Sequence, residues 1–520
     1  MNKITINEMP PLKVAFFSTV ETEQLTLIFV SILKRFHEQG VQDLLYNIEG
    51  RKIKRARGLK EMSSMKSKSS KSLLIITSAL ILASLVTACG KTSNDPTPTS
   101  SETSKVATAT PVASTSASKP VTIKFAGWGD PSEKEVFTKL IKSFQEKNPN
   151  IKVEYLHIPA DYVGKMNTIL AGGDAPDVFY VPDGDFGRWV SQDLLLPIDD
   201  FMKSSKIDTA DMWNSALVRY RYNGAVTGQG KLYALPKDIG PTVLYYNKDI
   251  FKKMNVPFPS ADSPMTFDQL LDTAKKLTVT NNGKTEQYGM GPIWWEGFVM
   301  GNGGKFLSDD KKEFLLNSKE ATDALQFAAD LSNKNKVVPS AAALKDMNDG
   351  QMFQTGKLAM MIQGRWMVPE YRKLKFDWDV APLPTNGKWA GWSGSVGLGI
   401  FSKSKNKEAA YKLVEFLGGP EGQKEQSLMG FAIPSFKSMA NTDIFLQPGQ
   451  KPEHASVFIK AAENEINGPW TNLPNAKWWD LLGQSMGPMW EGKISAVDLM
   501  KDLKPKIDKA IQEGNPALFK

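Results

Sequence analysis

The chain has 520 residues, too many for one hydrophobic core, so at least two lobes are expected. Its net charge of +8 comes mainly from residues 1–88, which carry 13 Lys and Arg against 7 Asp and Glu and leave 51 basic and 49 acidic residues from Cys89 onward, so no nucleic-acid-binding face is indicated. Three His and one Cys exclude a Cys/His metal cluster and a disulfide within the monomer.

The lone cysteine follows an export signal. Lysines between 66 and 71 precede an apolar run over 73–86, which has the length of a signal-peptide core and is short for a transmembrane helix. The small and apolar residues before Cys89 resemble the processing site of bacterial lipoproteins. This resemblance implies a signal peptide over 65–88, cleavage before Cys89 and lipidation of Cys89. The alternative is a cysteine buried in a helix.

The segments on either side of the signal have different compositions. Residues 1–64 do not fit a signal peptide, and Met65 would give a compact one. Our hypothesis is that 1–64 are upstream sequence read in frame by an over-long gene prediction; the alternative is a cytoplasmic extension. Residues 89–119 are rich in Ser, Thr, Pro and Ala, which predicts a disordered tether.

The first lobe begins with alternating strands and helices. Strands are predicted over 121–126, 151–158 and 177–181 from their β-branched and aromatic residues, and amphipathic helices over 133–147 and 161–171. This alternation favours a mostly parallel sheet covered by helices, in which ligands bind beyond the carboxyl ends of the strands. Turns follow the first and third strands, with acidic residues at Asp130, Asp183 and Asp185.

A crossing between lobes is predicted over 232–251. A short strand over 232–235 is followed by Pro236 and a Gly-Pro break, and then by a second strand over 242–246. Asn247 is expected to cap the next helix. Later helices are predicted over 266–277, 320–333, 349–355 and 406–417, a buried strand over 358–362, and a return crossing at 398–401.

Several stretches resemble extracellular solute-binding proteins of family 1, the maltose-binding-protein-like carbohydrate receptors of bacterial ABC importers. They are LYALP running into LYYNKDIF, NPNIKVEY, APDVFYV and GKLAMMIQGRW, and the resemblance covers about 121–511. It implies an α/β, two-lobe periplasmic-binding-protein-like fold of type II, each lobe a mostly parallel sheet with flanking helices and a ligand cleft between them. The expected lobes are 120–236 with 393–450, and 241–390 with 455–520.

A carbohydrate site needs flat aromatic faces and planar polar groups. Tryptophans, carboxylates and an arginine after the predicted strands are candidates, although core packing or an ordinary surface role is the alternative for each. The candidate ligand-binding residues are Trp128, Asp130, Asp183, Asp185, Asp238, Trp294, Trp295, Glu296, Arg365, Trp366, Trp392, Ser395, Trp478 and Trp479. No metal site is expected, because Asp183 and Asp185 lack the spacing of a calcium loop.

The sequence therefore favours a lipid-anchored sugar or oligosaccharide receptor on the outer face of the cell membrane. Its expected partners are a carbohydrate, the permease subunits of an importer and the membrane, with no cofactor and no nucleic acid, and the protein is expected to be a monomer. The alternatives are a glycoside hydrolase, for which Asp238 and Glu296 could supply the carboxylates, a surface adhesin, and a receptor for another solute. No Ser-His-Asp order or phosphate-binding loop supports another enzyme class.

Overall fold

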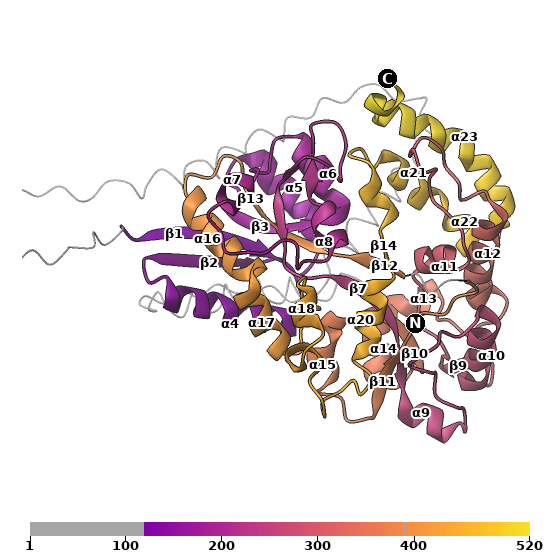
Figure 1. Ribbon diagram of the computed structural model, residues 1–520. Coiled ribbons are helices and arrows are strands. Elements are labelled where there is room, and N and C mark those ends of the chain that lie inside the picture. The colour runs from indigo at the N-terminus through magenta and orange to yellow at the C-terminus, as the bar shows by residue number, and fades with distance from the viewer. Residues whose placement is uncertain (1–118, 388–390) are drawn as a thin grey trace, which may run out of the picture. The chain divides into compact units, whose positions relative to one another are not determined.

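The computed structural model describes residues 119–387 and 391–520, and all of them belong to one compact unit, Pro111–Lys520 (Figure 1). The extension 1–64, the predicted signal peptide, Cys89 and the tether up to residue 118 lie outside the described residues. Among the helices of the described part, none has both the length and the apolar character that a membrane span requires.

The first sheet has five strands in the order β2-β1-β3-β13-β6. Their bounds are β1 Val121–Gly127, β2 Ile151–His157, β3 Val178–Pro182, β6 Ala234–Pro236 and β13 Val396–Ile400. β1 runs parallel to β2 and β3, whereas β13 runs antiparallel to β3 and β6. The predicted strand–helix alternation is confirmed, with α4 over Pro131–Lys147 and α5 over Tyr162–Gly172. The apolar stripe of α4, which predicted this helix, is buried in the first core.

The acidic turn predicted at 183–185 is wrong. Asp183 and Asp185 form the first turn of a helix, α6, over Asp183–Ser191, with Pro182 in the N-cap position. Acidic side chains suit a first turn because the amide groups there are free to interact with negative charge. The other elements of this lobe are α7 Asp199–Met202, α8 Asn214–Val218, β4 Arg221–Tyr222, β5 Lys231–Leu232, α16 Lys407–Gly418 and α17 Pro420–Leu428.

The second sheet is built around one long strand, β7, over Gly240–Asn247, which is buried along its whole length. Its path is β10-β7-β12-β14, and β11 also pairs with β7. The bounds are β10 Met360–Gly364, β11 Trp378–Ala381, β12 Gly391–Gly394 and β14 Glu465–Asn467. The expectation of mostly parallel strands is wrong for this sheet, because β10, β11 and β12 all run antiparallel to β7 and only β12 and β14 are parallel.

The chain passes between the sheets at the first predicted crossing, where residues 237–239 lie between β6 and β7. The return crossing is at Ser395, between β12 and β13, a few residues before the predicted 398–401, whose first three residues belong to β13. The chain crosses between the lobes a third time after α17. In this third crossing the carbonyl of Ile433 accepts from the N–H of Ile239, a residue of the first crossing (3.0 Å). Ala440 and Phe445, which we expected in the first lobe, pack in a core cluster with residues of the second sheet. Their apolar side chains bring this segment to the second sheet earlier than the break expected at 450–455.

The helices of the second lobe begin where the capping residues predicted. Asn247 accepts from the N–H of Ile250 (3.0 Å) and starts α9, and Thr266 forms a capping box with Gln269 at the start of α10. The helices are α9 Lys248–Lys253, α10 Phe267–Leu277, α11 Trp295–Gly301, α12 Lys319–Asn333, α13 Ala341–Asp346, α14 Asp349–Gln354, α15 Val368–Tyr371, α18 Lys437–Ala440, α19 Asp443–Leu446, α20 Ser456–Glu463, α21 Lys477–Ser485, α22 Gly487–Trp490 and α23 Ala496–Gly514. Short elements complete the lobe: β8 Val279–Asn281, β9 Lys284–Gln287, η1 Arg365–Met367, η2 Pro469–Asn472 and η3 Pro516–Phe519.

Candidate functional site

A pocket of about 290 Å³ lies where the two lobes meet, and we call it the interlobe pocket. The first sheet and its helices contribute Trp128, Glu133, Pro182, Asp183 and Val396, and the second contributes Gly240, Trp294, Trp366, Gly394 and Trp470; the crossings and the segment after α17 contribute Lys237, Asp238, Ser395 and Phe431. Six of the predicted residues therefore line it: Trp128, Asp183, Asp238, Trp294, Trp366 and Ser395.

The indole rings of this pocket are fixed by other aromatic rings. Trp294 and Trp366 lie nearly parallel, with ring centroids 6.3 Å apart and planes at 26°. Trp128 meets the rings of Tyr162 and Tyr180 edge-on, at 4.8 and 4.9 Å. These contacts hold both walls in place before any ligand enters, which lowers the entropic cost of binding.

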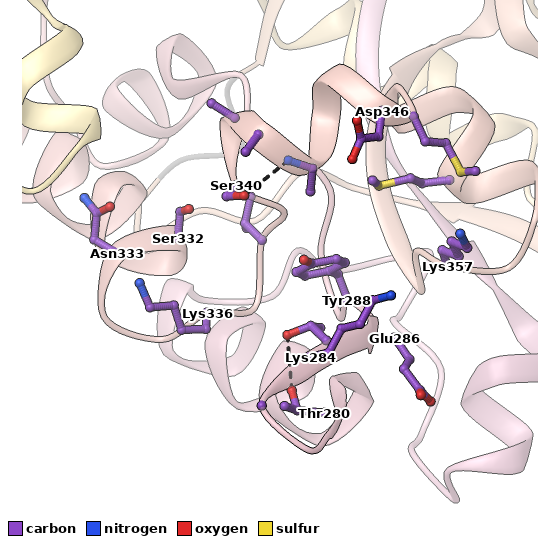
Figure 2. A pocket seen from close by; sticks show the side chains of 18 of the residues that line it. Thr280, Lys284, Glu286, Tyr288, Ser332, Asn333, Lys336, Ser340, Asp346 and Lys357 are labelled. Carbon is purple, nitrogen blue, oxygen red and sulfur yellow. Dashed lines mark hydrogen bonds between the residues drawn. The ribbon is translucent and has the colours of Figure 1, made fainter. Parts of the chain in front are cut away.

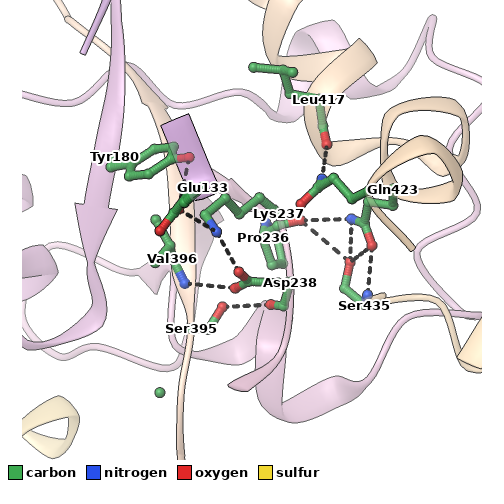
Figure 3. A network of polar contacts seen from close by, with 12 residues as sticks. Glu133, Tyr180, Pro236, Lys237, Asp238, Ser395, Val396, Leu417, Gln423 and Ser435 are labelled. Atoms are coloured by element: carbon green, nitrogen blue, oxygen red, sulfur yellow. Dashed lines mark hydrogen bonds and ion pairs between the residues drawn. The ribbon is translucent and has the colours of Figure 1, made fainter. Parts of the chain in front are cut away.

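A buried lysine forms one side of the interlobe pocket. Lys237 is only 2% exposed, and its ammonium group pairs with Asp238 and lies 3.6 Å from Glu133 Oε1 (Figure 3). Three aromatic rings surround the same group, those of Phe137, Tyr180 and Phe431, at 5.1–5.3 Å. Burial alone would lower the pKa of Lys237, but the two carboxylates outweigh it and raise that pKa above its ordinary value. The site thus keeps a cation in an enclosed position.

Glu133 is the other carboxylate beside this lysine. Burial raises its pKa from 4.5 to about 7, although Lys237 opposes the shift and the Tyr180 hydroxyl donates to the carboxylate (3.3 Å). Asp238 is held differently, because it also accepts from the N–H of Val396 (3.2 Å). Ser395 donates its hydroxyl to the Asp238 carbonyl (2.9 Å), so the two crossings are bonded to each other at the pocket.

The raised pKa of Glu133 gives a pH dependence of stability. Because the folded-state value of about 7 lies above the unfolded value near 4.5, the stabilisation is complete below pH 4.5 and is lost as the pH rises through 7. Between pH 5 and pH 7, the free energy of unfolding of the wild type should fall by about 2 kcal/mol relative to that of Glu133→Gln. Denaturant unfolding at both pH values measures this, and Glu154→Gln, at an exposed strand position, controls for the lost charge. Parallel pH profiles for the wild type and Glu133→Gln would contradict the expectation.

Asp183 lies on the pocket wall with its carboxylate already bonded. Arg219 donates to one oxygen (2.8 Å) and the indole N–H of Trp470 to the other (3.0 Å). Arg219 is fully covered and also donates to the Ser393 carbonyl (2.8 Å) and to the side chain of Asn467 (2.8 Å). This arginine therefore ties the end of β3 to β12 and β14 of the other sheet.

A second pocket, of about 590 Å³, adjoins the first and shares Pro182, Asp183, Trp294 and Trp470 with it. We call it the tryptophan pocket; its remaining lining is Gly184, Asp185, Arg188, Ile293, Trp295, Glu296, Ala476, Trp479 and Asp480. The rings of Trp295 and Trp479 stack at 5.7 Å with planes at 17°. Asp185 pairs with Arg188 (2.7 Å). Burial raises the pKa of Glu296 to about 7.

Three predicted residues, Asp130, Arg365 and Trp478, lie outside the lining of both pockets, and a fourth is not tested. Asp130 is the N-cap of α4 and accepts from the N–H of Glu133 (2.8 Å). Arg365 is 1% exposed, with its guanidinium over the rings of Phe445 (4.6 Å) and Phe458 (5.4 Å). Trp478 is fully buried in the second core. For Trp392 only the backbone, in β12, is described.

Sequence reasoning missed eight residues of the interlobe pocket, of which four have charged or aromatic side chains: Glu133, Lys237, Phe431 and Trp470. One signal was available for Lys237, because a charged residue within the apolar crossing segment, between Pro236 and Asp238, needs a buried partner. Trp470 stands four residues before Pro474 in a tryptophan-rich segment, but its contact with Asp183 joins positions 287 residues apart. No local pattern could have indicated that contact.

A larger cavity lies elsewhere in the described part of the chain. This groove has a volume of about 1250 Å³ (Figure 2). It is lined by the β8–β9 hairpin, by the end of α12, by α13 and by the segment just before β10, and its lining includes Tyr288, Lys336, Asp346 and Lys357. All of its lining residues belong to the second lobe, and none of the predicted site residues is among them. Its side chains mix both charges with small polar groups, so size alone does not make it a ligand site.

Comparisons with known proteins agree with the fold. The sequence profile of bacterial extracellular solute-binding proteins matches residues 130–424. A maltotriose-binding protein of Pyrococcus abyssi is 26% identical over 72% of this chain and 76% of its own length. A maltooligosaccharide ABC transporter solute-binding lipoprotein of Streptococcus pneumoniae is 27% identical over 86% of this chain and its whole length.

Solved structures show the same architecture. An ABC substrate-binding protein of Listeria monocytogenes in complex with cycloalternan superposes with a TM-score of 0.69 at 24% identity, over 76% of this chain and 99% of that one. The maltose/maltodextrin-binding domain of Bdellovibrio bacteriovorus bound to maltotriose gives 0.63 at 22% identity, over 75% and 100%. The predicted two-lobe α/β fold class is therefore confirmed.

Proposed function

The chain belongs to the family of bacterial extracellular solute-binding proteins, and we propose that it binds an oligosaccharide between its lobes and delivers it to an ABC importer. The family consists of binding proteins, so the chain is not an enzyme. The observation that carries the proposal is the interlobe pocket, where the indoles of Trp128, Trp294 and Trp366 stand beside the buried charges of Lys237 and Asp238.

This lining suits the chemistry of a pyranose. The indole faces are electron-rich and match the polarised C–H groups of a sugar ring, while carboxylates accept from pairs of hydroxyls. The neighbouring tryptophan pocket continues the same aromatic wall through Trp294 and Trp470, which leaves room for more than one ring. Relatives that bind maltotriose and maltooligosaccharides support a linear glucan as the ligand class.

Delivery requires that the permease can distinguish the ligand-bound protein from the ligand-free protein. A ligand that touches both lobes stabilises the closed form over the open one, and the permease would recognise the closed form. The lobes also touch beside the pocket, where the Ser132 hydroxyl donates to Glu370 (2.7 Å) and accepts from Lys373 (2.9 Å). We expect the protein to act as a monomer, with one ligand site and one permease contact surface.

The test is a melting experiment with sugars. At a ligand concentration of about 100 times its dissociation constant, binding should add about 2.7 kcal/mol to the free energy of unfolding and raise the melting temperature. Maltotriose and longer maltooligosaccharides are the first compounds to screen, and the recovered sugar should be chemically unchanged. A shift with amino acids or peptides and none with saccharides would favour the alternative, a receptor for a non-sugar solute.

We propose that Cys89 carries the lipid that holds the protein at the outer face of the membrane. The streptococcal relative is named a lipoprotein, which supports an anchor at the single cysteine of this chain. A lipidated cysteine of this kind carries two acyl chains, which suffice for stable anchoring.

Cys89→Ala should therefore release the protein from the membrane or leave an uncleaved precursor. Membrane fractionation and the apparent size of the product measure both outcomes. Ser93→Ala, four residues along the same segment, is the matched control and should stay anchored. A Cys89→Ala protein that remains membrane-bound at the processed size would contradict the anchor.

A further inference from the structure

The tryptophan pocket has an unbalanced negative charge. Four of its lining residues are acidic (Asp183, Asp185, Glu296 and Asp480) and one, Arg188, is basic. Two of the acids are neutralised within the protein, because Arg219 pairs with Asp183 and Arg188 with Asp185, both with short nitrogen–oxygen contacts. Among the described residues, neither Glu296 nor Asp480 has an ion-pair partner.

Glu296 is the more informative of these two acids. It lies in the first turn of α11, between the tryptophan pocket and a smaller cavity of about 250 Å³ that Trp295, Trp479 and Trp490 also line. Among the described residues no side chain donates to its carboxyl group, which accepts from its own backbone N–H, and Trp295 and Trp479 line both of these cavities with it. Burial raises its pKa to about 7, which is the effect expected when no cation compensates the charge.

Aromatic faces together with an uncompensated carboxylate form a recognition site for an organic cation. An ammonium group is attracted by the negative charge of Glu296 and by the electron-rich faces of the indoles. Both attractions are stronger in a partly dehydrated site than in bulk water. A hydroxyl in the same place gains a single hydrogen bond, and an anionic group is repelled by the remaining acids. The four-residue wall shared with the interlobe pocket makes the two cavities parts of one binding region.

We propose that the tryptophan pocket receives a protonated amino group of the ligand, so that the protein prefers amino-sugar-containing saccharides over neutral ones of the same size. Glu296 is the specificity-determining residue, and Trp295 and Trp479 supply the aromatic surface. The inference rests on the proposed function, because it assumes that a saccharide occupies the adjoining interlobe pocket.

The experiment compares neutral and amino ligands of one skeleton. The probes are maltotriose and three derivatives in which one primary hydroxyl, on one ring at a time, is replaced by an amino group that is protonated at pH 7. Calorimetric titration is carried out with the wild type, Glu296→Gln and a charge-matched control, Glu463→Gln, at an exposed position of α20. We expect at least one derivative to bind the wild type tenfold or more tightly than maltotriose does. That advantage should disappear in Glu296→Gln and persist in Glu463→Gln.

The outcomes separate this inference from the function on which it rests. If maltotriose binds and no amino derivative binds more tightly, or if the advantage survives in Glu296→Gln, the cation site is wrong and the oligosaccharide proposal stands. If none of the four saccharides binds, both proposals fall together. Melting of the ligand-free proteins checks folding: a Glu296→Gln variant that melts like Glu463→Gln but has lost the advantage assigns that advantage to the carboxylate.

Discussion

Replacing Lys237 by methionine is expected to lower the free energy of unfolding by about 3–5 kcal/mol at pH 7. The substitution keeps the length of the side chain and its contact with Phe137, Tyr180 and Phe431, but it leaves Glu133 and Asp238 buried without their cation. An uncompensated carboxylate in such a place is costly. Denaturant unfolding of the ligand-free protein measures the loss.

Two comparisons make this expectation specific. At pH 5 the loss should be smaller, because Glu133 takes up a proton more readily once its cation is gone. Lys139→Met removes a lysine whose ion pair with Glu135 is exposed, and it should cost less than about 1 kcal/mol. If Lys237→Met and Lys139→Met had equal effects, the buried cluster would not hold the crossing together.

Trp366→Ala is expected to weaken ligand binding by about tenfold to a thousandfold while the ligand-free protein keeps its fold. The indole stacks beside that of Trp294 in the wall of the interlobe pocket and covers Gly240, where an added Cβ would come within 3.2 Å of the ring. Removing it widens an open pocket and leaves no closed cavity in a core. Titration with the saccharide found in the melting screen measures the affinity, and melting of the ligand-free variant measures the stability.

Trp478 gives the matched contrast. It was predicted as a ligand contact, but it is fully buried in the second core, so Trp478→Ala should cost about 3–5 kcal/mol of stability. A Trp366→Ala protein that melts as low as Trp478→Ala with unchanged affinity would remove Trp366 from the site.

The first three strands and two helices of the first lobe could be predicted because each one carries its own periodic pattern, whereas α6 and the short elements after it were not predicted. The stripe of α4 and the β-branched strands β1 and β2 are local features, and so are the caps at Asn247 and Thr266. Strand direction in the second sheet was not predictable in this way. The antiparallel pairing of β7 with β10 depends on contacts more than a hundred residues apart.

The sequence also does not reveal which individual side chains point into the pocket. Arg365 and Trp366 are neighbours in η1 and were both predicted to contact the ligand, yet one lies over Phe445 in a core cluster and the other lines the pocket. Successive residues of a tight helical turn point in different directions, and the sequence does not reveal which direction meets the pocket. Asp183 was predicted as a site residue because it directly follows β3. Its partner Arg219 lies 36 residues away in the sequence and could not be predicted in this way.

The position of β13 constrains the order in which a newly made chain can fold. This strand joins β3 to β6 in the middle of the first sheet, and it is synthesised only after the whole segment from Lys237 to Ser395. A nascent chain that ends before β13 already contains β3 and β6 but lacks the strand that lies between them in the sheet. The first lobe therefore cannot close while its own N-terminal half emerges, and the loop that must be closed contains most of the second lobe.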